Sequence, residues 1–202
     1  MYLHGMLATT PGFQYVQQRA LANEAKALHF TVLIPTSPLV EGGYYWPTSR
    51  TAIEAQEPDI LARIARARAD VGARVGRPFD ETFVVGFSSG AYYGSSLALR
   101  GALDVDGYII LAGGASWARP KEPGKRAPVF VGVSKRDGQT AEHSRALAGT
   151  LAALRWPYRV EEREVGHLVD WGFMAHGIAW LRGRATSGRD AGGGEPRDAG
   201  GG

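Results

Sequence analysis

One serine in this chain stands in a setting that could make its hydroxyl a nucleophile. Ser88 is the centre of Gly86-Phe87-Ser88-Ser89-Gly90, which directly follows the apolar, partly β-branched run Thr82–Val85. The pattern predicts a buried strand, a sharp turn at Ser88 and a helix that starts at once. The two glycines fit such a turn because backbone presses on backbone there. We therefore interpret this segment as a nucleophile elbow, with a plain glycine-rich turn as the alternative.

A serine hydroxyl is a weak nucleophile at neutral pH and needs a nearby base that is itself oriented by an acid. Such groups collect beyond the carboxyl ends of parallel strands. Asp137 follows the predicted strand Pro128–Val133, and His167 follows the predicted strand Tyr158–Val165. We therefore predict Asp137 as the acid and His167 as the general base. The alternatives are an Asp-Gly turn residue and a hydrogen-bonded surface histidine.

The remaining candidates are weaker. His29, His143 and His176 lie in or at the ends of predicted helices, where a structural or solvated role is expected. Asp170 is the second choice for the acid, but it lies only three residues after His167 and is expected to cap the last helix.

An attacked carbonyl gains negative charge, which backbone N–H groups can stabilise. The first donor is expected to be the N–H of Ser89, at the start of the helix. The segment Leu3-His4-Gly5-Met6 has the right place for the second, so we predict the N–H of Met6. His4 is expected to hold this loop. After the predicted strand Phe30–Ile34 we expect a long irregular loop from Thr36 to Arg50. This loop carries Tyr44, Tyr45 and Trp46, which could line a substrate pocket, and a hydrophobic plug under the loop is the equal alternative.

Predicted strands and helices alternate along the chain, which favours an α/β fold with a mostly parallel sheet covered on both faces. One of the expected helices contains Pro58 in its first turn. The chain should form one domain over residues 1–184, followed by a disordered Gly-rich tail over 185–202. The expected strands are Phe30–Ile34, Val105–Leu111, Pro128–Val133 and Tyr158–Val165, and the expected helices are Gln14–Leu28, the Pro58 helix, Ser89 to about Arg100, Thr140–Leu154 and Asp170–Leu181.

Composition narrows the class of protein further. The 202 residues suffice for one sizeable core, and 44% hydrophobic and 21% charged residues are typical of a soluble globular domain. The chain has no cysteine, which excludes disulfides and thiolate chemistry. The net charge is only +3. One predicted helix carries a series of arginines that we expect to form a solvated face: Arg63, Arg66, Arg68 and Arg74. We predict no cofactor, no metal, no nucleic-acid partner and no membrane span.

With these residues in place, the chain resembles an α/β-hydrolase-fold serine hydrolase. The order Ser88, Asp137, His167, the elbow motif and the early His4-Gly5 all match that pattern, and the resemblance covers about residues 1–184. The layout is similar to small carboxylesterases and to the polyhydroxybutyrate-depolymerase, feruloyl-esterase and dienelactone-hydrolase-like group. The resemblance implies a three-layer fold and hydrolysis of a small-molecule carboxylic ester through an acyl-enzyme.

The chain departs from the family at its start, because the His-Gly loop follows only three residues. The usual first two strands are absent, which leaves about six strands and an exposed edge. The fold is then either minimal or truncated at this end. We expect a cytoplasmic protein because no signal peptide is visible, although a truncated start would have removed one.

Substrate selection stays open at this stage. A shallow cleft for short-chain or aryl esters is expected, with thioesters, lactones and peptides as alternatives for the same three residues. A protein of another class, a non-catalytic binding protein on a truncated hydrolase fold, is the rival hypothesis. A phosphate cradle at Gly86–Gly90 is disfavoured because the run matches neither a dinucleotide-binding motif nor a P-loop.

Overall fold

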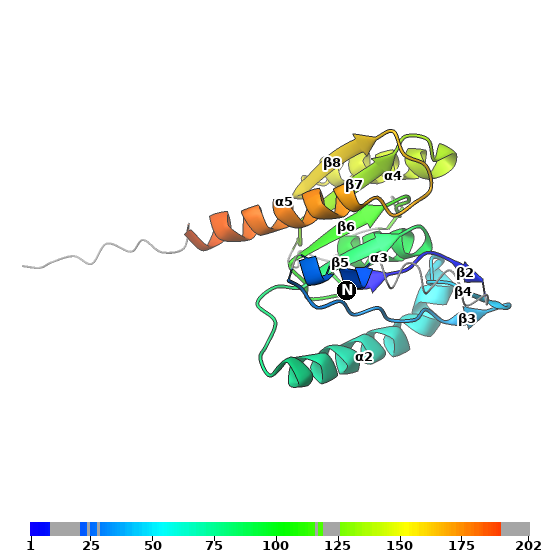
Figure 1. Cartoon of the computed structure of the whole chain (residues 1–202). Coiled ribbons are helices and arrows are strands. Elements are labelled where there is room, and N and C mark those ends of the chain that lie inside the picture. Colours follow the sequence, from blue (N-terminus) through cyan, green and yellow to red (C-terminus); the bar gives the residue numbers. More distant parts are fainter. Residues whose placement is uncertain (9–20, 24, 28, 116, 119–125, 191–202) are drawn as a thin grey trace, which may run out of the picture.

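A computed structural model of the chain describes residues 1–8, 21–23, 25–27, 29–115, 117–118 and 126–190 (Figure 1). Its main sheet is parallel throughout and has the strand order β1-β5-β6-β7-β8. The α/β class and the parallel sheet are as predicted. The strands are β1 (Tyr2–Leu3), β5 (Phe83–Phe87), β6 (Gly107–Leu111), β7 (Val129–Ser134) and β8 (Tyr158–Arg163).

Alternating side chains of these strands enter two hydrophobic cores, one on each face of the sheet. Val84 and Ile110 belong to the first core, whereas the neighbouring Val85 and Ile109 belong to the second. This is the two-residue period of a strand that is buried on both faces. Figure 1 shows α3 and α4 on one side of the sheet and α5 on the other. The helices are α2 (Arg50–Val75), α3 (Ser89–Arg100), α4 (Gly138–Ala153) and α5 (Trp171–Asp190).

A second, small antiparallel sheet lies beside the first and has the order β2-β4-β3. Its strands are β2 (Leu7–Ala8), β3 (Leu39–Val40) and β4 (Gly43–Tyr44). The segment between Thr36 and Arg50, expected as an irregular loop, thus contains a short hairpin that pairs with the chain just after Met6.

The main sheet has five strands where about six were expected, because Phe30–Ile34 forms no strand. This segment runs next to β1, and the Tyr2 N–H donates to the Leu33 carbonyl at 2.8 Å. Pro35 follows at once and has no N–H with which to continue a ladder. The predicted strand is therefore an extended segment with a hydrogen bond to β1.

The helix that contains Pro58 starts eight residues earlier than predicted. Ser49 caps α2 by accepting a hydrogen bond from the Ala52 N–H at 3.2 Å, so Pro58 lies inside the helix. Of its arginines, Arg63, Arg66 and Arg74 are exposed, as expected. Arg68 instead reaches the sheet and donates to the Thr82 hydroxyl at 3.2 Å.

Two predictions concern segments that the structure covers only in part. Residues 21–23 and 25–27 are helical, and the rest of the helix predicted at Gln14–Leu28 lies outside the described residues. The predicted tail boundary at residue 185 falls inside α5, and residues 191–202 lie outside the described residues. Within the described part of the chain, no helix combines the length and apolar character needed to cross a bilayer.

Tight backbone packing around Gly90 generates the first prediction. A methyl group at Gly90 would lie in steric conflict with the Leu3 carbonyl and 2.7 Å from the His4 carbonyl oxygen. We expect Gly90→Ala to lower the free energy of unfolding by about 1–3 kcal/mol or more, measured by urea denaturation. The matched control is Gly149→Ala in α4, where a methyl meets nothing within 4 Å. This change should raise stability by about 0.5–1 kcal/mol. Equal effects of the two substitutions would contradict the packing argument.

Candidate active site

Ser88 lies at the turn between β5 and α3, in a backbone conformation that few residues adopt. Its φ is 51° and its ψ is −119°. Backbone strain of this kind persists only where the surroundings enforce it. A methyl at Gly86 would collide with the backbone of Gly90, so only glycine allows α3 to turn back this closely against β5. The predicted strand–turn–helix context of Ser88 is therefore present.

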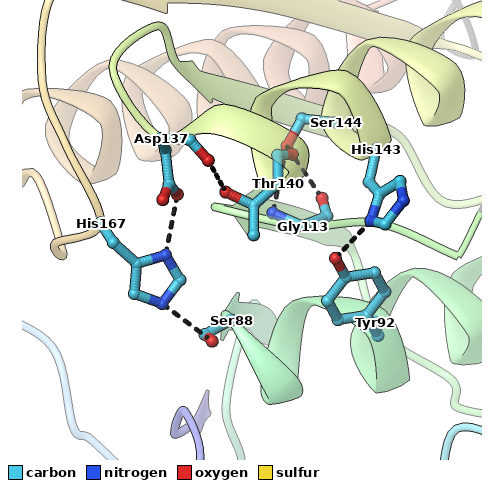
Figure 2. A network of polar contacts seen from close by, with 8 residues as sticks. All are labelled: Ser88, Tyr92, Gly113, Asp137, Thr140, His143, Ser144 and His167. Carbon is cyan, nitrogen blue, oxygen red and sulfur yellow. Dashed lines mark hydrogen bonds and ion pairs between the residues drawn. The ribbon is translucent and has the colours of Figure 1, made fainter.

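The three predicted site residues come together in one hydrogen-bonded chain (Figure 2). Nε2 of His167 lies 3.0 Å from the Ser88 Oγ, and Nδ1 of His167 lies 2.8 Å from Oδ2 of Asp137. A carboxylate can only accept hydrogen bonds, so Nδ1 of His167 carries the proton and donates a hydrogen bond to Asp137. Nε2 of the neutral ring is then free to accept the Ser88 hydroxyl proton.

The strand order of the main sheet explains why Ser88 and His167, 79 positions apart in the sequence, lie in contact. Ser88, Asp137 and His167 follow β5, β7 and β8, whose carboxyl ends lie at the same edge. The Arg136 N–H donates to the Val165 carbonyl at 3.0 Å, which joins the loops that carry Asp137 and His167. The Asp137 side chain is 9% exposed and that of His167 is 44% exposed, so Asp137 is shielded from solvent while His167 can contact a solute.

His4 holds the loop after β1 in place, as its position in the sequence suggested. Its Nε2 accepts from the Ser37 N–H at 3.1 Å, and Nδ1 donates to the Gly5 carbonyl at 2.6 Å. These partners define the neutral form of the ring. Burial lowers the pKa of His4, although the bond to Gly5 acts in the opposite direction. The loop brings Gly5 against the elbow, where an added methyl would lie 3.3 Å from the Ser88 Cβ.

The predicted donors, the N–H groups of Ser89 and Met6, therefore lie on two segments that flank Ser88. Ser89 is the first residue of α3, where backbone N–H groups have no partner inside the helix. Met6 directly follows Gly5 and its side chain is exposed.

The three aromatic residues predicted to line a pocket have different environments. Trp46 is buried and stacks on Tyr93 at 5.4 Å between ring centroids. Its indole N–H donates to the His4 carbonyl at 2.9 Å, and its backbone N–H donates to the Ser89 hydroxyl at 3.2 Å. Trp46 thus matches the plug interpretation and braces the loop after β1 against α3. Tyr44 is half-buried and Tyr45 is exposed.

The other titratable candidates have structural contacts of their own. Asp170 accepts the Phe173 N–H at 3.0 Å at the start of α5, which is the expected cap. His176 contacts Glu161 at 2.9 Å, and His29 is exposed. His143 differs, because its Nδ1 lies 2.6 Å from the hydroxyl of Tyr92, one helical turn after Ser88. Sequence reasoning missed Tyr92; its spacing of four residues from Ser88, at the start of the same helix, was the available signal.

A cavity of about 390 Å³ lies elsewhere, near the amino end of β5. Phe83 and Phe79 line it, together with Met174 and Ile178 of α5. Ser88, Asp137 and His167 do not line it, because they follow the opposite ends of the strands.

No family model matches the chain, and no curated protein matches its sequence. Several solved structures do match its fold. An uncharacterized protein from Bacillus cereus ATCC 10987 aligns with a TM-score of 0.64 at 14% identity, over 91% of this chain and 59% of that chain. The chain thus spans about three fifths of that protein's length.

Structures described as esterases match over most of both chains. Esterase PE8 aligns with a TM-score of 0.57 at 22% identity, over 90% of this chain and 89% of that chain. The Bacillus cereus carboxylesterase aligns with a TM-score of 0.56 at 16% identity, over 90% and 86%. Together with the parallel sheet and the elbow, these alignments establish that the chain has the α/β-hydrolase fold.

The buried, neutral His4 generates a prediction about pH and stability. Its pKa is lowered in the folded state, so the unfolded chain binds more protons at this site. Stability from neutral His4 is therefore fully present above pH about 6.5 and is lost as the pH falls through the region below it. We expect His4→Gln to flatten this part of the curve of unfolding free energy against pH, measured by urea denaturation between pH 5 and 8. Parallel curves for the two proteins would contradict a buried neutral His4.

Proposed function

We propose that this protein is a serine hydrolase that cleaves carboxylic esters through an acyl-enzyme. The observation that carries the proposal is the chain of contacts from Ser88 to His167 at 3.0 Å and from His167 to Asp137 at 2.8 Å. These distances lie within the hydrogen-bond reach that proton transfer requires. Carboxylesterases among the structures with the same fold support the same conclusion.

The reaction follows from the positions of these groups. His167 Nε2 takes the Ser88 proton as Ser88 Oγ bonds to the ester carbonyl carbon, and the N–H groups of Ser89 and Met6 hold the resulting oxyanion. The C–O bond to the alcohol then breaks, and the alcohol leaves with the proton from His167. Water, deprotonated by His167, attacks the acyl-enzyme and releases the carboxylic acid and Ser88.

Asp137 acts through His167. Its carboxylate accepts the Nδ1 proton, which keeps Nε2 free to accept, and its negative charge stabilises the imidazolium formed in each step. The shielded position of Asp137 strengthens this interaction because less water competes for the carboxylate.

Short-chain or aryl esters are the proposed substrates. His167 is nearly half exposed, so a small ester can reach Ser88 from solvent. Tyr44 and Tyr45, near the loop after β1, remain candidates for substrate contact. Thioesters and lactones would use the same steps and are arms of the substrate panel that tests this proposal.

Removal of the nucleophile generates the first functional prediction. We expect Ser88→Ala to lower kcat for p-nitrophenyl butyrate by about 10³-fold or more while the fold is kept, as measured by circular dichroism. A fluorophosphonate probe should label the wild type at Ser88 and leave the variant unlabelled. Retained hydrolysis by Ser88→Ala would refute the nucleophile. A wild type that neither labels nor hydrolyses would favour the non-catalytic binding protein.

The acid can be tested with a matched pair of aspartates on either side of His167. We expect Asp137→Asn to lower kcat by about 10³–10⁴-fold, because an amide in this place disfavours the required tautomer of His167. Asp170→Asn should change kcat little, because an asparagine can also cap α5, and should lower the thermal midpoint only slightly through loss of the ion pair with Arg163 at 3.3 Å. A larger loss of kcat in Asp170→Asn than in Asp137→Asn would reverse the assignment.

A further inference from the structure

Three rings on the β6 side of Ser88 play no part in the steps above. Tyr92 lies on α3, His143 on α4, and Trp117 in the segment after β6. The Tyr92 and Trp117 rings stack with centroids 5.8 Å apart at an interplanar angle of 23°. The Tyr92 and His143 rings meet edge to face at 5.7 Å. We refer to Tyr92, His143 and Trp117 as the aromatic wall.

The aromatic wall adjoins the nucleophile. The Tyr92 N–H donates to the Ser88 carbonyl at 3.2 Å, so Tyr92 sits one turn into the helix that Ser88 begins. Helical side chains lean toward the amino end of their helix, which directs the Tyr92 ring over the turn that contains Ser88. Figure 2 shows Tyr92 and His143 beside the Ser88–His167–Asp137 chain, with Thr140 between the two groups.

The Tyr92 ring is fixed in place from two directions. Its hydroxyl lies 2.6 Å from Nδ1 of His143, and a methyl at Gly113 would lie 2.9 Å from its Cε2, so backbone packs against the ring. Gly113 is itself held by Ser144, whose Oγ accepts the Gly113 N–H and donates to the Gly113 carbonyl, both at 3.1 Å. A ring fixed in advance loses little freedom when a ligand packs against it.

The wall is open to solvent and uncharged at its centre. Trp117 is 50% exposed although its ring already stacks on Tyr92. Burial, and after it the negative charge of Asp137, raises the pKa of Tyr92, so its hydroxyl stays protonated. An exposed aromatic surface of this kind next to a nucleophile favours a planar apolar group over an anion.

The strand order tells which part of an ester would meet the wall. The loop with Met6 follows β1, on one side of β5. Trp117 follows β6, and His143 belongs to α4, the helix after β7. Both strands lie on the opposite side of β5 from β1, between β5 and β8, and His167 follows β8. His167 gives its proton to the departing alcohol, so the alcohol lies on the side of the wall.

We propose that the aromatic wall is a subsite that binds a planar aryl group in the alcohol portion of the ester. This inference rests on the proposed function and specifies its substrate class: esters of aryl-bearing alcohols are preferred over saturated esters of similar size. Trp117 and Tyr92 supply ring faces, and His143 is a positioning residue that holds Tyr92 through the hydroxyl.

The test compares benzyl acetate with cyclohexylmethyl acetate, which have similar size and similar leaving alcohols but differ in planarity. We expect the wild type to show the higher kcat/KM for benzyl acetate. Trp117→Ala and Tyr92→Ala should each reduce the ratio of the two kcat/KM values about two- to tenfold, the range that a stacked aromatic pair provides. Tyr92→Phe keeps the ring face and should keep most of the ratio. Tyr158→Ala, an exposed tyrosine on β8, is the matched control and should leave the ratio as in the wild type.

Three outcomes would overturn the subsite. One is an equal loss on both acetates in Trp117→Ala. Another is a loss in Tyr92→Phe as large as in Tyr92→Ala, which would mean that a hydrogen bond selects the substrate. The third is an effect confined to methyl phenylacetate against methyl cyclohexylacetate, which would place the ring on the acyl side. In every variant a fluorophosphonate probe should still label Ser88. If the wild type and the variants are labelled but show no preference for the aryl ester, the subsite alone is rejected. If the wild type is not labelled, the proposed hydrolase function is rejected as well.

Discussion

The close approach of the first turn of α3 to the backbone of β1 is the constraint on which the candidate site depends. At Gly90 the helix lies so near the Leu3 and His4 carbonyls that any side chain would collide with them. At Gly86, in β5, a side chain would collide with the backbone of Gly90 in the same helix. These two contacts force the turn at Ser88 into its rare conformation and hold the loop after β1 against the start of α3. The strain at Ser88 is thus enforced by packing on both sides of the turn.

Buried polar contacts complete this arrangement from the outside. Trp46 joins the His4 carbonyl to the Ser89 hydroxyl, and His4 joins Gly5 to Ser37. The side chains of Trp46 and His4 are buried, so a lost partner would leave a polar group without water to replace it. The loop after β1 is therefore held in place by buried hydrogen bonds on both sides.

Much of this arrangement follows from the sequence because its causes are local or topological. The Gly-x-Ser-x-Gly segment and the strand ends before Asp137 and His167 predict which side chains meet, since parallel strands end at one edge. Phe30–Ile34 looked like a strand because its composition is apolar, yet its place beside β1 gives it no ladder. The start of α2 was missed because Pro58 was expected in a first turn, whereas the cap is Ser49, nine residues before Pro58. Contacts such as Tyr92 with His143, 51 residues apart, arise from side-chain packing between helices and leave no local pattern.

The placement of the aromatic wall divides the molecule into a part that must stay constant and a part that is free to change. The positions of Ser88, Asp137 and His167 depend on strand ends and on the backbone packing at Gly86 and Gly90, where an added side chain would collide with the backbone. Trp117, after β6, is 50% exposed and stacks on the ring of Tyr92. If the proposed function holds, substitution of Trp117 would change which alcohols are accepted while the packing around Ser88 stays intact, so related chains are expected to diversify first at this position.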